Sequence, residues 1–288
     1  MPSLQEFQRA VKAVRPLPEV AHRVLRIVQG EDWAIGELVA IVRTEPTLVA
    51  RILRLCNSAR SGLDVEISSI ADAISMLGSR NLVQLVLITC SSGMFCGAKN
   101  SLYADPATLW HHSVACALAC QLIAARTGQV SPANAFTAGI LHDVGKIVIA
   151  QATDVAQVLD AIAASGQDHD SHVGFERRMF GIDHARAAGL VADSWQLPAT
   201  LANAMRSHHD EKAMAGDDAM PAVLHTADQL VLQAGIGNAF PRLNVDIHAA
   251  ALERLELDSN DLAALTRGLG VELAAAAELL NIHPAGSR

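Results

Sequence analysis

The sequence places an imidazole and a carboxylate side by side in an apolar run, Gly139-Ile140-Leu141-His142-Asp143-Val144-Gly145-Lys146. Burying both groups among Ile, Leu and Val is costly unless a partner compensates them. A divalent cation is the partner that suits both. If the run is helical, the two side chains project about 100° apart. The pair can then hold a cation from two directions, or Asp143 can bridge two cations.

Other histidines and aspartates occupy apolar or helix-end positions in the second half of the chain, and eleven of the 12 histidines follow residue 110. The candidate ligands are His111 or His112, His142, Asp143, His184, His208, His209 and Asp228. This set exceeds the four ligands of a tetrahedral zinc site. Mixed imidazole and carboxylate ligands suit Fe, Mn, Zn, Ni or Co. We therefore expect one or two divalent metal ions.

Two cations about 3.5 to 4 Å apart can clamp a phosphate and generate hydroxide near neutral pH. This is the chemistry of a phosphohydrolase. Lys146 lies one turn beyond His142 and can hold a phosphate oxygen or the metal-bound water. Asp143 and Lys146 are therefore the candidate catalytic residues.

The remaining polar residues are interpreted as structural. Cys116, one turn after His112, can act as a soft ligand, but we interpret it as a packed thiol. Glu176-Arg177-Arg178 reads as an ion-paired helix face. The other histidines have no partner in the pattern: His169 and His172 in a polar loop, His248 and His283.

The composition predicts a packed all-α protein. The chain is 51% hydrophobic and 18% charged, with only 3% aromatic residues and much alanine. Such a composition favours closely packed helices over a sheet. Helical patterns are visible over 4–14, 19–28, 35–42, 46–55, 70–77, 81–89, 109–125, 155–164, 175–180, 184–192, 200–206 and 223–232, with two or three more over 249–282.

The 288 residues exceed what one core usually supports. Ser91 to Pro106 is rich in Ser, Gly and Asn and is the best linker candidate. It divides the chain into an N-terminal helical part, 1–100, without chemistry of its own, and a metal-binding helical part, 101–288.

Charge and hydropathy argue against several partners. A net charge of −8 is unfavourable for a protein that binds the phosphate backbone of nucleic acid. We see no run of about 18 apolar residues and no signal peptide at the start. The five cysteines are odd in number and mostly lie in apolar pattern, which indicates reduced thiols. We expect a cytoplasmic protein without a nucleic-acid or membrane partner.

Taken together, these residues resemble the HD superfamily and, within it, the HDOD signalling output domains. The likeness covers most of the chain. In the first part it rests on Pro16-Leu17-Pro18-Glu19-Val20, Leu53-Arg54-Leu55-Cys56-Asn57-Ser58-Ala59 and Ile67-Ser68-Ser69-Ile70-Ala71-Asp72-Ala73-Ile74. In the second part it rests on Leu109-Trp110-His111-His112-Ser113, the His142-Asp143 run, the segment from Glu176 to His184, Trp195-Gln196-Leu197-Pro198, His208-His209 and Ala227-Asp228.

The resemblance implies an N-terminal helical module packed on an HD-superfamily helical bundle. It places the first ligand just before Ser113, which selects His112 over His111. It implies metal-ligand roles for the other six residues: His142, Asp143, His184, His208, His209 and Asp228. Many HDOD domains have lost several of these ligands and act through protein contact, whereas the set here is nearly complete.

The related HD-GYP phosphodiesterases share the His-Asp-x-Gly-Lys run and hydrolyse cyclic di-GMP. They carry a Gly-Tyr-Pro segment after the His-His pair, and residues 210–221 contain none. This difference argues against cyclic di-GMP as the substrate.

Two functions follow from the sequence. We favour a bacterial signal-transduction domain that binds metal and acts on a signalling protein partner by contact. The alternative is a metal-dependent phosphohydrolase that acts on a small phosphorylated compound or a nucleotide.

Overall fold

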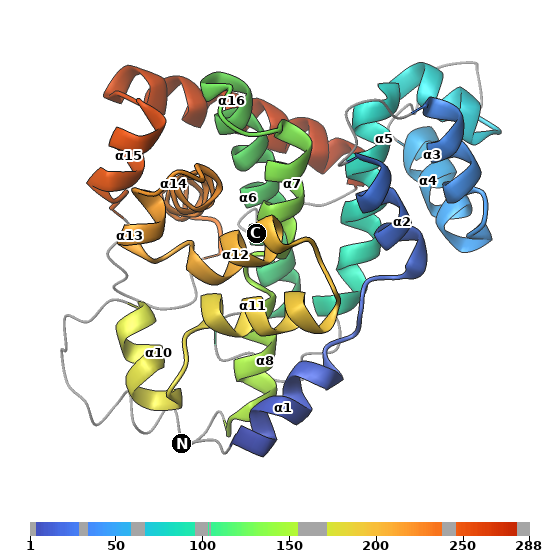
Figure 1. Cartoon of the computed structure of the whole chain (residues 1–288). Helices are drawn as coiled ribbons and strands as arrows, with labels where there is room; N and C mark the ends of the chain where they lie inside the picture. The colour runs from blue at the N-terminus through green and yellow to red at the C-terminus, as the bar shows by residue number, and fades with distance from the viewer. Residues whose placement is uncertain are drawn as a thin grey trace, which may run out of the picture.

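The computed structural model describes residues 4–28, 34–58, 67–95, 103, 105–154, 172–237 and 246–280. Within these ranges every regular element is a helix and no strand occurs, which confirms the predicted all-α fold. The helices form an N-terminal group and a larger group that surrounds the long helix α6 (Figure 1). The helix predicted over 155–164 lies outside the described residues.

The N-terminal part contains α1 (Leu4–Ala13), α2 (Glu19–Val28), α3 (Ile35–Val42), α4 (Pro46–Ser58) and α5 (Ile70–Phe95). These bounds agree closely with the predicted helices. Ser69 caps the start of α5: its hydroxyl accepts from the Asp72 backbone N–H at 3.1 Å and donates to the Asp72 carboxylate at 2.7 Å. Helix α3 packs on α2 and α5, and α4 packs on α5.

Helix α5 is interrupted at Gly78, whose φ of 79° lies in the left-handed region. Glycine adopts this conformation without the steric penalty of a side chain. The predicted end of a helix at Gly78 is therefore confirmed. The predicted linker was wrong at its start, because α5 continues through residues 91–95 to Phe95. Residues 96–102 and 104 lie outside the described ranges.

The second part contains the helices predicted over its described residues and three further helices, at 132–141, 144–152 and 211–214, that were not predicted. It consists of α6 (Pro106–Thr127), α7 (Pro132–Leu141), α8 (Val144–Ala152), α10 (His172–Phe180), α11 (His184–Ser194), α12 (Ala199–Ser207), α13 (Glu211–Met214), α14 (Met220–Gln233), α15 (Ala249–Leu255) and α16 (Ser259–Leu280). Gly181, with a φ of 74°, separates α10 from α11, which agrees with the gap between the helices predicted over 175–180 and 184–192.

Helix α6 is the central element of this part. The Asp105 side chain caps its N-terminus, Pro106 occupies its first position, and Gly128 ends it with a φ of 66°. Asp105 and Pro106 were predicted as linker, but they start the helix. Helix α6 packs against α5, α7, α14 and α16, and most of its side chains are buried. The stretch from His112 to Cys120 is continuously buried and therefore lies inside the bundle, whereas Asp105 at the amino-terminal end is exposed.

The two parts share one core. The buried hydrophobic side chains of the described residues form one continuous cluster that extends from Phe7 in α1 to Leu269 in α16. Helix α1 packs against α8 and α11, and α5 packs against α6 and α7 (Figure 1). The predicted boundary near residue 100 stays a prediction.

Two of the described helices, α5 and α6, are long and apolar enough to cross a membrane by length and composition alone. However, 50% of the apolar window of α5 and 67% of that of α6 are buried inside the protein. Core helices of soluble proteins have the same character, so their hydropathy is explained by their packing.

Candidate metal centre

Two histidines stand directly after the last residue of a helix and are held in the same way. His142 is the C-cap of α7, and His208 is the C-cap of α12. Each donates from Nδ1 to the backbone oxygen three residues earlier, that of Gly139 or Met205, at 2.8 Å. The Nε2 atom of each is buried and has no hydrogen-bond partner.

The run His142-Asp143 is therefore not one continuous helix. Asp143, with φ −94° and ψ 7°, forms the junction between α7 and α8. The expected angle of about 100° between two helical neighbours does not apply at this junction. Instead, the end of α7 presents both side chains to the interior.

His112 and His184 also use Nδ1 as an anchor. Nδ1 of His112 donates to the backbone oxygen of Ile236 at 3.1 Å. Nδ1 of His184 lies 2.7 Å from a carboxylate oxygen of Glu176, which also accepts from the His184 backbone N–H at 2.7 Å. In both residues Nε2 faces the centre. Such partners fix the tautomer and the orientation of metal-binding imidazoles.

Asp143 and Asp228 connect the imidazoles. Oδ2 of Asp143 lies 3.3 Å from Nε2 of His112 and 3.4 Å from Nε2 of His142. Oδ1 of the same residue lies 3.5 Å from Nε2 of His184. Oδ1 of Asp228 lies 3.0 Å from Nε2 of His112 and 3.9 Å from Nε2 of His142. One carboxylate thus faces two groups of histidines.

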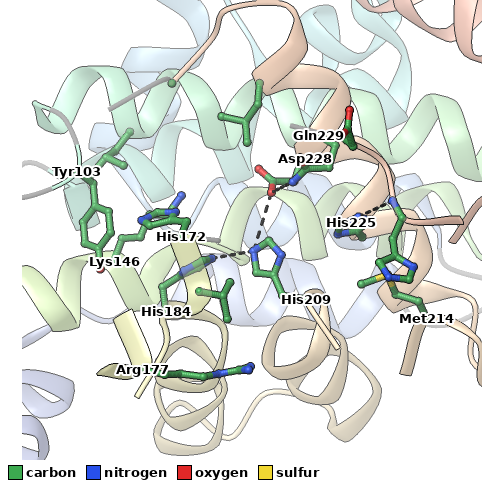
Figure 2. A pocket seen from close by; sticks show the side chains of 16 residues that line it. Tyr103, Lys146, His172, Arg177, His184, His209, Met214, His225, Asp228 and Gln229 are labelled. Carbon is green, nitrogen blue, oxygen red and sulfur yellow. Dashed lines mark hydrogen bonds and ion pairs between the residues drawn. The ribbon is translucent and has the colours of Figure 1, made fainter. Parts of the chain in front are cut away.

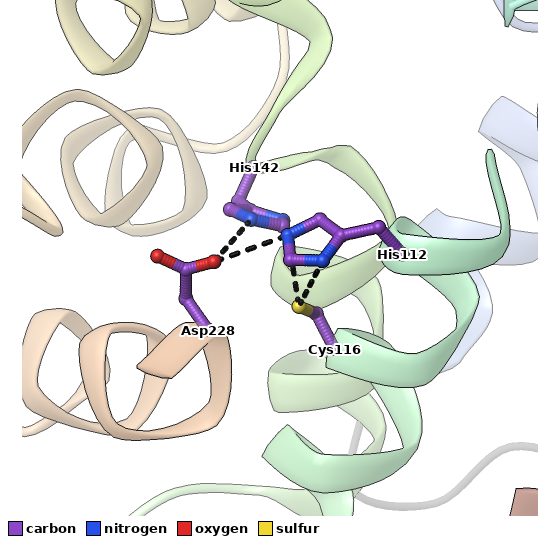
Figure 3. A group of neighbouring side chains, drawn as sticks. All are labelled: His112, Cys116, His142 and Asp228. Carbon is purple, nitrogen blue, oxygen red and sulfur yellow. Dashed lines mark hydrogen bonds and ion pairs between the residues drawn. The ribbon is translucent and has the colours of Figure 1, made fainter. Parts of the chain in front are cut away.

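The donor atoms form four overlapping groups within the described residues, and the following two of them share no member. We call the first group subsite 1; it contains His112, Cys116, His142 and Asp228 (Figure 3). We call the second subsite 2; it contains His184, His208 and His209. Asp143 lies between them. The structure thus brings together all seven residues predicted as metal ligands, from α6, the ends of α7 and α12, α11 and α14.

His111, the alternative to His112, belongs to neither subsite. Its ring lies beside the Trp110 ring, with the centroids 5.4 Å apart. Periodicity alone could not decide between His111 and His112. The rotation of α6 decides it, because it turns His112 inward and fully buries it.

Burial and charge set the protonation of the centre. Burial raises the pKa of Asp143, but the His142 and Lys146 cations outweigh it, so this pKa falls well below its usual range. Burial lowers the pKa of His142, but the Asp143 carboxylate outweighs it and raises the pKa to about 10. Burial and the neighbouring His142 and His184 lower the pKa of His208 to about 3.

These directions describe a centre that is prepared for a cation. The carboxylates are ionised and His208 is neutral, as metal ligands must be, whereas His112 and His142, whose pKa values are raised, must release a proton when a metal binds. Nε2 of His184 and Nε2 of His209 face each other at 3.0 Å, so two imidazole nitrogens converge on one place. The buried side-chain atoms without a hydrogen-bond partner include Nε2 of His142, Nε2 of His208, Oδ1 of Asp143 and Oδ1 of Asp228. Divalent cations fit this donor set.

Lys146 lies at the edge of the centre. Its Nζ is 2.5 Å from Oδ2 of Asp143 and 5.9 Å from the centre of the Tyr103 ring. The lysine is buried, and burial lowers its pKa, but the Asp143 and Asp228 carboxylates outweigh this and raise it. Lys146 therefore stays charged beside Asp143.

A cavity of about 300 Å³ adjoins the centre (Figure 2). Its polar lining combines the centre with further basic side chains: His184, His209 and Asp228, with Lys146, His172, Arg177, His225 and His248. Its apolar lining includes Tyr103, Leu109, Met214 and Leu232. A small ligand in this cavity would contact both the candidate ligands and the positive groups.

Two glycines are required by close packing around the centre. A Cβ on Gly145 would lie 1.9 Å from the backbone oxygen of His184 and 2.5 Å from the nitrogen of Ala188. A Cβ on Gly237, whose φ is 83°, would lie 2.6 Å from the His112 ring. Gly145 therefore allows α8 to contact α11, which aligns Asp143 with His184.

Several residues that were interpreted as structural lie at the centre or its cavity. Glu176 is not on an exposed ion-paired face; it is fully buried and holds His184. His172 is not in a polar loop; it begins α10, and its Nε2 is 3.2 Å from a Glu176 oxygen. His248 has a partner, because its backbone N–H donates to Nε2 of His225 at 3.1 Å.

One sequence signal could have placed Glu176 correctly. His172, Glu176 and Phe180 are spaced by four residues and therefore share one face of α10. Phe180 is buried, so Glu176 had to face the interior as well.

The sequence profile of the HDOD domain matches residues 14–211, which is more than half of the chain. The chain therefore belongs to the HDOD domain family. A protein of Treponema pallidum (strain Nichols), described as uncharacterized, is 25% identical over 195 residues. The match covers 67% of this chain but only 37% of that protein, so the chain spans little more than a third of this relative's length.

Solved structures share the fold. An HDOD domain protein of unknown function from Geobacter sulfurreducens is similar with a TM-score of 0.76 at 26% identity, over 96% of each chain. A candidate phosphohydrolase from Shewanella amazonensis SB2B is similar with a TM-score of 0.67 at 26% identity, over 95% of this chain and 96% of that one. A candidate signal transduction protein from Marinobacter aquaeolei VT8 shares the fold with a TM-score of 0.71 at 21% identity. The match covers 96% of this chain and 65% of that one.

Proposed function

We propose that this HDOD protein binds one or two divalent cations of the group Fe, Mn, Zn, Ni and Co. His112, His142 and Asp228 would hold one cation, His184, His208 and His209 another, and Asp143 would contribute to both. The support is the set of buried polar atoms that make no hydrogen bond. Their burial costs free energy unless a cation binds them. A divalent cation bound there supplies Lewis-acid polarisation of a phosphoryl oxygen.

We further propose that the centre works as a metal-dependent phosphohydrolase on a small phosphorylated compound or nucleotide. The observation that carries this proposal is the cavity beside the ligand set, which is lined by Lys146, Arg177 and five histidines. Positive side chains in a partly apolar cavity attract and orient a phosphate. Without such a cavity, a substrate could not reach the centre.

Each residue around the cavity has a defined task in this proposal. Lys146 holds the Asp143 carboxylate in place, and its remaining N–H groups can donate to a phosphate oxygen. Nε of Arg177 is engaged with Asp183 at 2.6 Å, which leaves the other guanidinium nitrogens for the ligand. Tyr103 and Leu109 exclude water from that side.

Substrate size follows from the cavity. A volume of about 300 Å³ is at the lower end of the range for small-molecule sites. This size suits a phosphomonoester or a mononucleotide better than cyclic di-GMP, which agrees with the absent Gly-Tyr-Pro segment.

A signalling role by contact with a protein partner is the second proposed function. The described residues of α2 to α5 contribute no donor to either subsite. However, α5 packs directly on α6 and α7, which carry His112 and precede His142. Occupancy of the centre can therefore affect the N-terminal helices, which would present a cation-dependent surface to a cytoplasmic signalling protein. Neither proposal involves nucleic acid or a membrane.

One experiment separates these functions. The metal content of purified protein is measured, and a panel of phosphomonoesters and phosphodiesters is assayed, for the wild type and Asp143→Ala. Exposed Asp217→Ala is the control. Bound metal with turnover that Asp143→Ala abolishes supports the phosphohydrolase. Bound metal without any turnover supports the signalling role. A wild-type protein that takes up no divalent metal overturns both proposals.

A further inference from the structure

Cys116 lies beside the candidate metal ligands, one turn after His112. The sequence alone allows it to be interpreted as a packed thiol. Its Sγ is 3.4 Å from Nε2 of His112 (Figure 3). This nitrogen is the same one that faces Asp228 at 3.0 Å. The thiol thus lies on the side of His112 that would hold a cation.

The distances within subsite 1 agree with a tetrahedral cation site. With Zn–S near 2.3 Å and Zn–N and Zn–O near 2.1 Å, the edges of a tetrahedron are about 3.6 Å for S···N and about 3.4 Å for N···O. The observed S···N distance from Cys116 to His112 is 3.4 Å. The observed N···O distances to Asp228 are 3.0 Å from His112 and 3.9 Å from His142.

The surroundings of Cys116 differ from those of an ordinary packed thiol. All four members of subsite 1 are buried, and their donor atoms lie within 4.8 Å of one another. Nε2 of His142 makes no hydrogen bond, and Oδ1 of Asp228 is paired with Nε2 of His112 at 3.0 Å. A thiol is a weak donor with one hydrogen and cannot satisfy the other three donor atoms. A cation that replaces the imidazole protons would bind all four.

We propose that the Cys116 sulfur is a ligand of the cation in subsite 1, together with His112, His142 and Asp228. This inference rests on the proposed metal binding and adds a soft donor to it. As the metal–sulfur bond forms, the thiol releases its proton to solvent. A thiolate donor favours Zn²⁺, Co²⁺ and Fe²⁺ over Mg²⁺ and Mn²⁺, so Cys116 determines which cation subsite 1 selects.

Cobalt absorption tests the proposal without an activity assay. The metal-free full chain is titrated with Co²⁺ while visible d–d bands and the near-ultraviolet thiolate-to-cobalt charge-transfer band are recorded. We expect both in the wild type. Cys116→Ser should lose the charge-transfer band and keep the visible bands. Cys120→Ser is the matched control, because Cys120 is also buried on α6, one turn further on, and it should keep both.

The outcomes distinguish this inference from the proposal on which it depends. Visible bands without a charge-transfer band in the wild type, or a band that survives Cys116→Ser, overturn the role of Cys116 and leave the metal centre intact. Absence of all cobalt bands overturns the metal centre as well. If Cys116→Ser does not fold, X-ray absorption of the zinc-loaded wild type decides: a sulfur neighbour at about 2.3 Å supports the proposal, and only nitrogen and oxygen neighbours overturn it.

Discussion

Glu176 holds His184 through two contacts of the same oxygen, 2.7 Å from the backbone nitrogen and 2.7 Å from Nδ1. The carboxylate is fully buried and comes from α10, whereas His184 begins α11. The contact therefore fixes the relative position of two helices and directs Nε2 of His184 toward subsite 2.

We expect Glu176→Gln to weaken divalent-metal binding by about 10- to 100-fold, the usual effect of removing a carboxylate behind a metal-binding histidine. The amide keeps the shape but loses the charge that makes the imidazole a stronger donor. Isothermal titration calorimetry with Zn²⁺ measures the affinity. Glu253→Gln, on the exposed side of α15, is the control and should bind as the wild type does. Equal affinities for both variants would contradict the supporting role of Glu176.

Glu176 also predicts a loss of stability in acid. Burial raises the pKa of Glu176, but His184 and His172 outweigh it and lower the pKa from 4.5 to about 2. As pH falls, the unfolded chain takes up this proton first, so the stabilisation is present above pH 4.5 and is lost between pH 4.5 and 2. This difference corresponds to about 3 kcal/mol for a fully buried group.

Thermal unfolding of the metal-free protein from pH 7 to pH 3 tests this expectation. His208, with its pKa lowered to about 3, adds a further loss of stability that begins as pH falls through 6.5. Below that pH the imidazole of the unfolded chain is protonated, whereas that of the folded protein stays neutral. The slope below pH 4.5 should be smaller in Glu176→Gln than in the wild type. Identical slopes in that window would show that Glu176 has no depressed pKa.

Lys146→Met should separate catalysis from metal binding. The variant keeps the candidate ligands but loses the positive charge 2.5 Å from Asp143. In the proposed phosphohydrolase, we expect kcat to fall by on the order of 10²- to 10³-fold, as when one preorganised donor is removed. Bound metal should remain, as atomic absorption can verify. Lys212→Met, at an exposed position of α13, is the control and should change neither kcat nor the metal content. An unaffected kcat in Lys146→Met would exclude a role of Lys146 in turnover.

Gly145→Ala should destabilise the fold by about 3 kcal/mol or more, because its Cβ would collide with backbone atoms of α11 that cannot move independently. Gly270→Ala is the contrasting control. Gly270 lies in α16 with nothing within 4 Å of its Cβ position, so alanine there should stabilise the protein by about 0.5 to 1 kcal/mol. Denaturant unfolding of the two variants checks both signs, and equal stabilities would contradict the packing argument.

The helices could be predicted from the sequence because their ends are marked locally. Pro46, Ser69, Gly78 and Gly181 each act through backbone conformation or capping, and these effects need no tertiary contact. The linker prediction failed near Ser91, because Ser and Gly within α5 are compatible with a helix that packing stabilises.

The metal ligands could be predicted as a set, but their partners could not. Apolar surroundings and the family motifs identify His142 and Asp228. The role of Cys116 depends on which face of α6 points inward, and that rotation is set by contacts with α7 and α14. His172 was assigned to a loop because its helix starts beside residues with polar character, and its contact with Glu176 follows only once residues 172–176 are known to be helical.

The position of His142 and His208 at the carboxyl ends of α7 and α12 affects how the centre takes up a metal. The last backbone carbonyls of a helix carry a partial negative charge. Two such helix termini and two aspartates favour positive charge in the interior, which the metal-free centre obtains from the protons on His112 and His142. An arriving metal must displace these protons, so metal uptake should release protons to the buffer and should weaken as the pH falls.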